Sequence, residues 1–429
     1  MTFASTWRGA YTWRMTRRSW GTVRASLTLG VGLVIAGSGC SRCSKPAEGE
    51  PTQESRAQNQ GAASPVRGTT PSSSEPTLTQ RASAFAAKLG KKHFLIGMGN
   101  DLNEDHDLDG AYTLGAPMDI HYAYLVGLGG KGGWPDWNPG GTFVDVLAES
   151  ARKHGVVPMF TLYSMAASGE GTSEVLSDSA YMKAYLDDAR LLFRRLGEFD
   201  APAIVHFEPD FWGFMQQKEP DPREHDAEVE PHAPECKGLG NSVAGLGRCL
   251  VRLARQNAPK TLVGFHASSW AHTEPKMIAN YLEDLGASEA DFVGVETLDR
   301  DAGCFEARKD PNCQRRDGPW YWDETNQRSP NFHEHLEWAR AIASGVRRPL
   351  LWWQMPLGVP SDTPGGKPGQ YRDNRVKYLF EHVDEFVAAG GVGAVFGVGA
   401  ANQTYITTDG GQFKRAVEKY RAEPFLFEP

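Results

Sequence analysis

Two acidic side chains follow a short apolar segment that is typical of a buried strand. The segment 204–207 is apolar apart from His206, and Glu208, Pro209 and Asp210 follow it directly. Side chains alternate between the two faces of a strand, so His206, Glu208 and Asp210 are expected to share one face. Carboxylates at the end of a buried strand are costly when unpaired. They are therefore either paired structurally or kept for chemistry.

A pair of carboxyl groups can cleave a glycosidic bond. One group protonates the leaving oxygen, and the other acts as a base or a nucleophile. The candidate catalytic residues are Asp210, Glu208, Glu296 at the end of another strand-like segment, and Asp362 in a Pro/Gly-rich loop. The structural alternatives are a salt bridge or helix cap for Glu208 and Asp210, and a solvated turn residue for Asp362.

Tryptophans gather at the predicted strand ends and in loops. Indole faces stack on the apolar faces of sugar rings, and the indole N–H can bond a polar edge. The pattern predicts a carbohydrate-binding site, and the alternative for each indole is a place in the core. The candidate substrate-binding residues are Trp212, Trp270, His266, Trp353, Gln354, Trp134, Asp101 and Asn402.

The pattern of apolar residues predicts strands that alternate with helices. Helical spacing is clearest over 143–154, 181–196 and 378–389. Most of the strand-like segments are apolar throughout, as in parallel strands that are covered on both faces. We therefore predict a (β/α)8 TIM-type barrel, in which functional residues follow the carboxyl ends of the strands. The eight predicted strands are 94–99, 120–126, 156–163, 203–207, 261–266, 292–296, 350–354 and 394–398.

The segment from Val205 to Trp212 resembles the Glu-Pro-Asp strand of glycoside hydrolase family 6, the inverting cellulases. The segment 351–362 loosely resembles that family's Trp-x-Lys-Pro-x-Gly-Glu-x-Asp motif. The resemblance implies that Asp210 is the general acid and Asp362 the base. The sequence departs from the family after the third strand, where the family's acidic loop is replaced by the segment 163–170.

Gln354 ends the predicted seventh strand, where the commonest retaining barrels carry a nucleophilic glutamate. Glutamine cannot serve as that nucleophile, so Glu296 would be the partner of Glu208 in a retaining enzyme. Glutamine at this position also favours a second hypothesis, a non-catalytic carbohydrate-binding protein with a degenerate hydrolase barrel. An esterase lacks support, since the sequence contains no Gly-x-Ser-x-Gly motif.

The amino terminus predicts export. Residues 1–39 carry five arginines and a short apolar stretch, which is typical of a signal peptide. The small residues before Cys40 resemble a bacterial lipoprotein signal, which implies a lipid anchor on Cys40 at the cell envelope; ordinary cleavage before Cys40 is the alternative. Residues 40–80 are rich in Ser, Pro and Gln and predict a disordered tether, and 81–429 hold the barrel.

Charge and cysteine spacing narrow the range of partners. Loss of residues 1–39 with their five arginines would change the formal net charge from −8 to −13, which argues against nucleic acid as a partner. In an exported chain, Cys236–Cys249 and Cys304–Cys313 are the expected disulfides, and neither pair has zinc-ligand spacing.

No cofactor is expected. Asp105, Asp107 and Asp109 resemble half of a calcium loop, but a solvated acidic loop is the stronger interpretation.

Overall fold

Eight parallel strands close into one barrel in the computed structural model. Neighbours along the chain are neighbours in the sheet, and β8 returns to pair with β1. This arrangement confirms the predicted (β/α)8 fold. The strands are β1 (Leu95–Gly99), β2 (Ile120–Val126), β3 (Val157–Tyr163), β4 (Ala203–Phe207), β5 (Thr261–Ala267), β6 (Phe292–Val295), β7 (Leu350–Met355) and β8 (Gly391–Phe396). The structure describes residues 75–99, 112, 114–298, 300–310, 313–314, 318–360, 367, 369–397 and 403–428.

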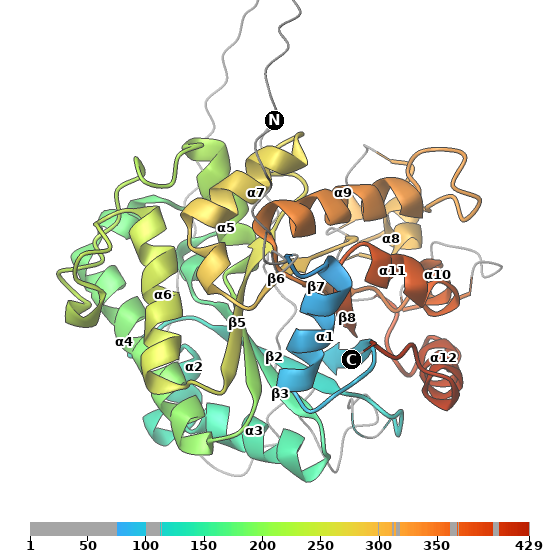
Figure 1. The fold of residues 1–429 in the computed structure, drawn as a ribbon, viewed down its shortest axis with the longest axis horizontal. Helices are drawn as coiled ribbons and strands as arrows, with labels where there is room; N and C mark the ends of the chain where they lie inside the picture. Colours follow the sequence, from blue (N-terminus) through green and yellow to red (C-terminus); the bar gives the residue numbers. More distant parts are fainter. Residues whose placement is uncertain are drawn as a thin grey trace, which may run out of the picture. The chain divides into compact units, whose positions relative to one another are not determined.

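Helices surround the strands on the outside of the barrel (Figure 1). Their apolar faces pack on the strands, and none of those in the described residues is both long and apolar enough to cross a bilayer. They are α1 (Leu78–Lys88), α2 (Trp134–Trp137), α3 (Phe143–Lys153), α4 (Ser179–Phe199), α5 (Pro209–Lys218), α6 (Val243–Asn257), α7 (Pro275–Asp284), α8 (Ala302–Ala307), α9 (Phe332–Val346), α10 (Arg375–Glu381), α11 (Val383–Ala388) and α12 (Gln412–Ala422).

The eighth strand begins three residues before its predicted start. Gly391 and Gly393 lie in β8, where glycine weakens the sequence signal for a strand. A Cβ atom on Gly393 would lie 2.6 Å from the Leu95 carbonyl oxygen, so the close approach of β1 requires glycine there. The helix predicted over 378–389 is two helices, α10 and α11, which meet at His382.

Both predicted disulfides are present. Cys236 bonds Cys249, and Cys304 bonds Cys313. The second bond joins α8 to Cys313 within one long segment, which connects β6 to α9. This segment begins beside the site described below. The predicted signal, Cys40 and nearly all of the predicted tether lie outside the described residues.

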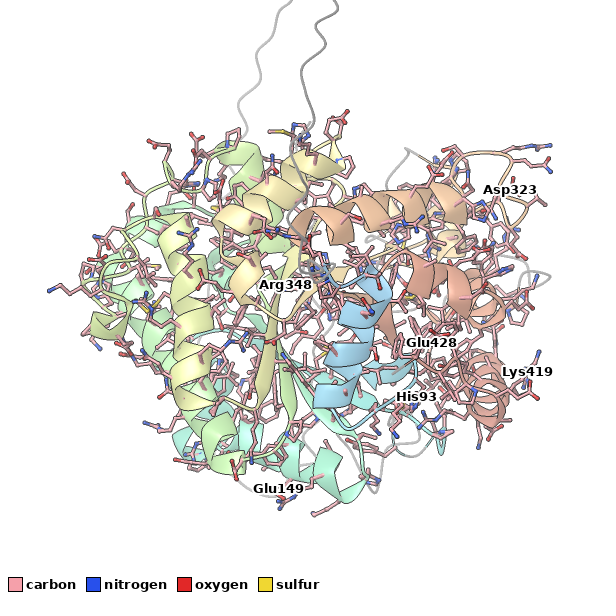
Figure 2. All side chains as sticks on the ribbon, viewed as in Figure 1. His93, Glu149, Asp323, Arg348, Lys419 and Glu428 are labelled. Carbon is pink, nitrogen blue, oxygen red and sulfur yellow. A yellow bond between two sulfur atoms is a disulfide. The ribbon has the colours of Figure 1, made fainter. Side chains whose placement is uncertain are left out.

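A buried ion cluster holds the end of the barrel where the strands begin. Asp119 precedes β2 and is fully buried; its carboxylate contacts His93 at 3.0 Å and Arg421 of α12 at 3.2 Å. Burial opposes ionisation of Asp119, but His93 and Arg421 outweigh it and lower the pKa of this carboxyl. Figure 2 labels His93 near this end of the barrel. These charges therefore serve stability at the end opposite the carboxyl tips of the strands.

Candidate active site

Carboxyl groups from the loop after β3 and from the first turn of α5 meet around one tyrosine at the carboxyl ends of β3 and β4. The Tyr163 hydroxyl lies 2.6 Å from Asp210 Oδ2 and 3.0 Å from Glu170 Oε1. A phenol carries a single proton, so it can donate to one of these carboxylates only. If both contacts are hydrogen bonds, the other carboxyl must itself carry a proton. The geometry therefore favours a proton held on the Asp210–Glu170 pair.

Asp210 has the protonation behaviour of a general acid. Burial, together with the charges of Glu296 and Glu170, raises the pKa of Asp210 to about 7, although Tyr163 and His266 oppose the shift. The side chain belongs to the first turn of α5 and is only partly buried. An acid with a pKa near the operating pH can both hold and release its proton. Asp210 is therefore suited to protonating a leaving group.

Glu296 supplies the second carboxyl group. It follows β6 directly, and its side chain is 15% exposed. Its Oε1 atom lies 3.9 Å from His266 Nε2, and its charge is the largest electrostatic contribution to the raised pKa of Asp210. The structure thus brings together Asp210, Glu296 and His266, three residues that the sequence predicted from separate strand ends.

Arg300 is a site residue that the sequence reasoning missed. Its guanidinium is buried, and burial lowers its pKa, while the neighbouring Tyr124, Glu296, Asp210 and Glu170 oppose that shift. An arginine stays protonated under such conditions, so Arg300 brings a positive charge to the acidic cluster. Its position four residues after Glu296, in the loop after a strand, was the one available signal.

Glu208 is fully buried and bonds backbone groups, and its predicted catalytic role stays a prediction. The side chain has no exposed surface, and its two oxygens accept hydrogen bonds from the backbone N–H groups of Ser164 at 3.0 Å and Met165 at 3.1 Å. Burial raises the pKa of Glu208 to about 8 in spite of these bonds. Glu208 therefore ties the end of β4 to the loop that runs from Tyr163 to Glu170.

Replacing Glu208 by Gln is expected to destabilise the fold. An amide offers one acceptor oxygen where two backbone N–H groups now bond, so one of them loses its partner. That loss costs about 1–3 kcal/mol of unfolding free energy. Denaturant titration measures it. Glu274→Gln is the matched control, because Glu274 also precedes a proline at the start of a helix but is exposed. Equal stability of the two variants would contradict the assigned role.

The indoles divide between the core and the site. Trp353 faces the barrel interior, with its ring centroid 5.1 Å from that of His206 and 5.6 Å from that of His266. Trp212 and Trp134 are buried without an exposed face, and Trp212 donates its N–H to the Phe207 carbonyl. Both were predicted to bind substrate, but the structure encloses them in the core, because apolar helix and loop segments cover these strand ends.

Trp270 lies partly exposed beside the acidic cluster. Its ring packs against Phe214, with centroids 4.6 Å apart. Phe214 is one helical turn after Asp210 on α5, so the two side chains share a face of that helix. The pair offers an aromatic surface next to the proposed acid. Gln354 lies buried at an irregular point of β7 with φ +52°, and its Nε2 has no hydrogen-bond partner among the described residues.

Several predicted residues lie outside the described residues: Asp362, Asp101, Asn402 and the calcium-loop candidates Asp105, Asp107 and Asp109. Their roles stay predictions. Within the described part of the chain, no group of three or more His, Cys, Asp or Glu side chains is arranged to hold a metal ion.

Replacing Glu170 by Gln is expected to lower the pKa of Asp210. Glu170 is one of the charges that raise this pKa, so its removal makes Asp210 a stronger acid. For a reaction in which Asp210 gives the proton, the alkaline limb of the kcat/KM profile then moves to lower pH. The profile of Glu174→Gln, an acid in the same loop, should match the parent protein. An unchanged profile in Glu170→Gln would show that Glu170 does not tune Asp210.

Comparisons with known proteins give distant structural similarities. No protein-family model matches the chain, and no curated protein sequence matches it. Similar solved structures include a GH26 beta-mannanase from Bacteroides ovatus, at 10% identity and TM-score 0.43, covering 82% of this chain and 96% of that chain. The endoglucanase Cel6 from Mycobacterium tuberculosis shows 15% identity and TM-score 0.30, over 62% and 73%. A D-allulose 3-epimerase from Methylomonas sp. shows 12% and 0.41, over 77% and 98%. At this level of similarity, only the residues of the site can support a function.

Proposed function

We propose that this protein is a glycoside hydrolase that acts on a polysaccharide, with Asp210 as the general acid. The observation that carries the proposal is the position of Asp210. It is a carboxyl group with a pKa of about 7 that accepts a hydrogen bond from Tyr163 and interacts electrostatically with a second carboxyl group, Glu296. Two carboxyl groups at one site, one of them able to give up a proton, are what cleavage of a glycosidic bond requires.

The reaction balances with these two groups and water. Asp210 gives its proton to the glycosidic oxygen as the bond to the sugar C1 breaks. Glu296 either takes a proton from the water that attacks C1, or bonds C1 first and is released by water afterwards. Arg300 lies beside the carboxyl cluster, where it brings a positive charge close to Glu296 and Asp210.

A substrate panel tests this proposal. β-Glucan, mannan, chitin and peptidoglycan are incubated with the purified protein, and released reducing ends are measured together with binding. Release from one of them supports hydrolysis. Binding without release would favour the second candidate, a non-catalytic carbohydrate-binding protein, for which Gln354 at the end of β7 is the supporting observation. If the protein neither binds nor cleaves any of these polysaccharides, both candidate functions are excluded. Tethering through Cys40 stays a prediction of the sequence.

Replacing Trp270 by Ala is expected to raise KM about tenfold on the polysaccharide that is cleaved, since one lost stacking contact corresponds to about 1.4 kcal/mol. kcat should change little, because an indole neither gives nor takes the proton that the carboxyl pair transfers. Initial rates over a range of substrate concentrations separate the two constants. Trp338→Ala, which removes another half-buried indole from α9, is the control. An unchanged KM in Trp270→Ala would exclude stacking at this position.

A further inference from the structure

Two histidines form a short chain from the barrel interior to the carboxyl cluster. His206 of β4 is fully buried, and its Nε2 atom lies 3.2 Å from Nδ1 of His266 at the end of β5. The other nitrogen of His266, Nε2, lies 3.9 Å from Glu296 Oε1. His266 thus contacts His206 through Nδ1 and lies near Glu296 through Nε2, so the two rings link the buried core to this carboxyl group.

The neighbouring residues hold the His206 ring in place. Trp353 packs against both imidazoles, and a Cβ atom on Gly294 of β6 would lie 2.4 Å from His206 Nε2. The place of this ring therefore depends on glycine at position 294. A histidine held in this way by its surroundings can fix the orientation of the ring that it contacts.

Proton placement in the pair follows from its hydrogen bonds. Burial and the neighbouring His266 lower the pKa of His206 far below its usual range, so His206 is neutral. If His206 donates from Nε2 to His266 Nδ1, the proton of His266 must sit on Nε2, facing Glu296. Donation in the opposite direction would give His206 a buried Nδ1–H, for which the described residues offer no acceptor. For a neutral His266, that direction would also turn a lone pair toward a carboxylate. The first direction also leaves a buried N–H without a hydrogen bond, at His266 Nε2, but this N–H faces the Glu296 carboxylate at 3.9 Å.

We propose that His206 is a positioning residue that fixes the tautomer of His266. The Nε2–H of His266 then faces Glu296 Oε1, 3.9 Å away. The roles of Glu296 and Asp210 rest on the proposed function, whereas the tautomer of His266 does not.

Nitrogen NMR of the full chain labelled with 15N-histidine tests the tautomer without any substrate. The His266 signals are assigned from their loss in His266→Asn. A protonated Nε2 in the parent protein, lost or mixed in His206→Leu and restored in His206→Gln, is expected; the glutamine amide can donate from the position of His206 Nε2. A His266 protonated on Nδ1 alone, or one that does not respond to His206→Leu, would overturn the proposal.

Kinetics on a cleaved polysaccharide give the second readout. kcat in His206→Leu should fall about tenfold with KM unchanged, because the His266 ring beside Glu296 loses its fixed tautomer, and His206→Gln should recover most of it. Gly294→Ala, which displaces the His206 ring without removing it, should behave like His206→Leu. A fixed tautomer in a protein that cleaves nothing would keep the proposal for His206 and reject the hydrolase. If the protein is active and kcat is unchanged in His206→Leu, the proposal for His206 is rejected and the hydrolase is kept.

Discussion

The variant Asp210→Asn is expected to lose about 10²–10⁴-fold in kcat on a polysaccharide, the range typical of removing a general acid. Asparagine keeps the size of the side chain and can still bond Tyr163, but it has no proton to give to the leaving oxygen. Reducing-end release under substrate saturation measures the loss. The thermal midpoint should be kept or raised, because the change removes one of three mutually repelling acids.

Two comparisons make this result specific. Asp200→Asn makes the same chemical change at a side chain that is 76% exposed, and its kcat should equal that of the parent protein. An aryl glycoside with a nitrophenolate leaving group needs little protonation, so Asp210→Asn should lose far less activity on it. Equal losses on both substrates, or unchanged turnover of the polysaccharide, would remove Asp210 as the acid.

The variant Glu296→Gln is expected to lose at least about 10²-fold in kcat, since the second carboxylate activates water or attacks the sugar. Its loss should persist on the aryl glycoside, unlike that of Asp210→Asn, because leaving-group chemistry does not replace a base or nucleophile. The same rate assay on both substrates measures this difference. Glu289→Gln, an exposed glutamate just before β6, is the control. Wild-type rates in Glu296→Gln would exclude Glu296 as the second catalytic carboxyl group.

The configuration of the product then defines the role of Glu296. Proton NMR during the first turnovers records which anomer forms. Inversion assigns Glu296 to the activation of water, and retention assigns it to attack on C1. Either result is compatible with Asp210 as the acid.

The sequence predicted the barrel well, because strands that are buried on both faces are apolar throughout. It placed the start of β8 three residues too late, because Gly391 and Gly393 interrupt the apolar pattern. The site was predicted in part. Asp210, Glu296 and His266 each follow or end a strand, and barrel closure brings such positions together.

Other residues of the site could not be predicted from spacing. Glu170 lies in a loop seven residues after Tyr163, and only the folded loop returns it to that hydroxyl. For Arg300, the one signal was its position four residues after Glu296. The different places of Glu208 and Asp210, two residues apart, depend on the left-handed conformation of Glu208 at φ +40°, which turns its carboxylate toward backbone N–H groups.

The placement of Asp119 has a practical consequence for engineering. Its cluster with His93 and Arg421 lies where the strands start, whereas Asp210 and Glu296 lie where they finish. Changes at distant sites without shared partners usually add independently. Thermal stability can therefore be changed at the end of the barrel where the strands begin, and turnover at the end where they finish. Variant libraries for the two properties can be built separately and then combined.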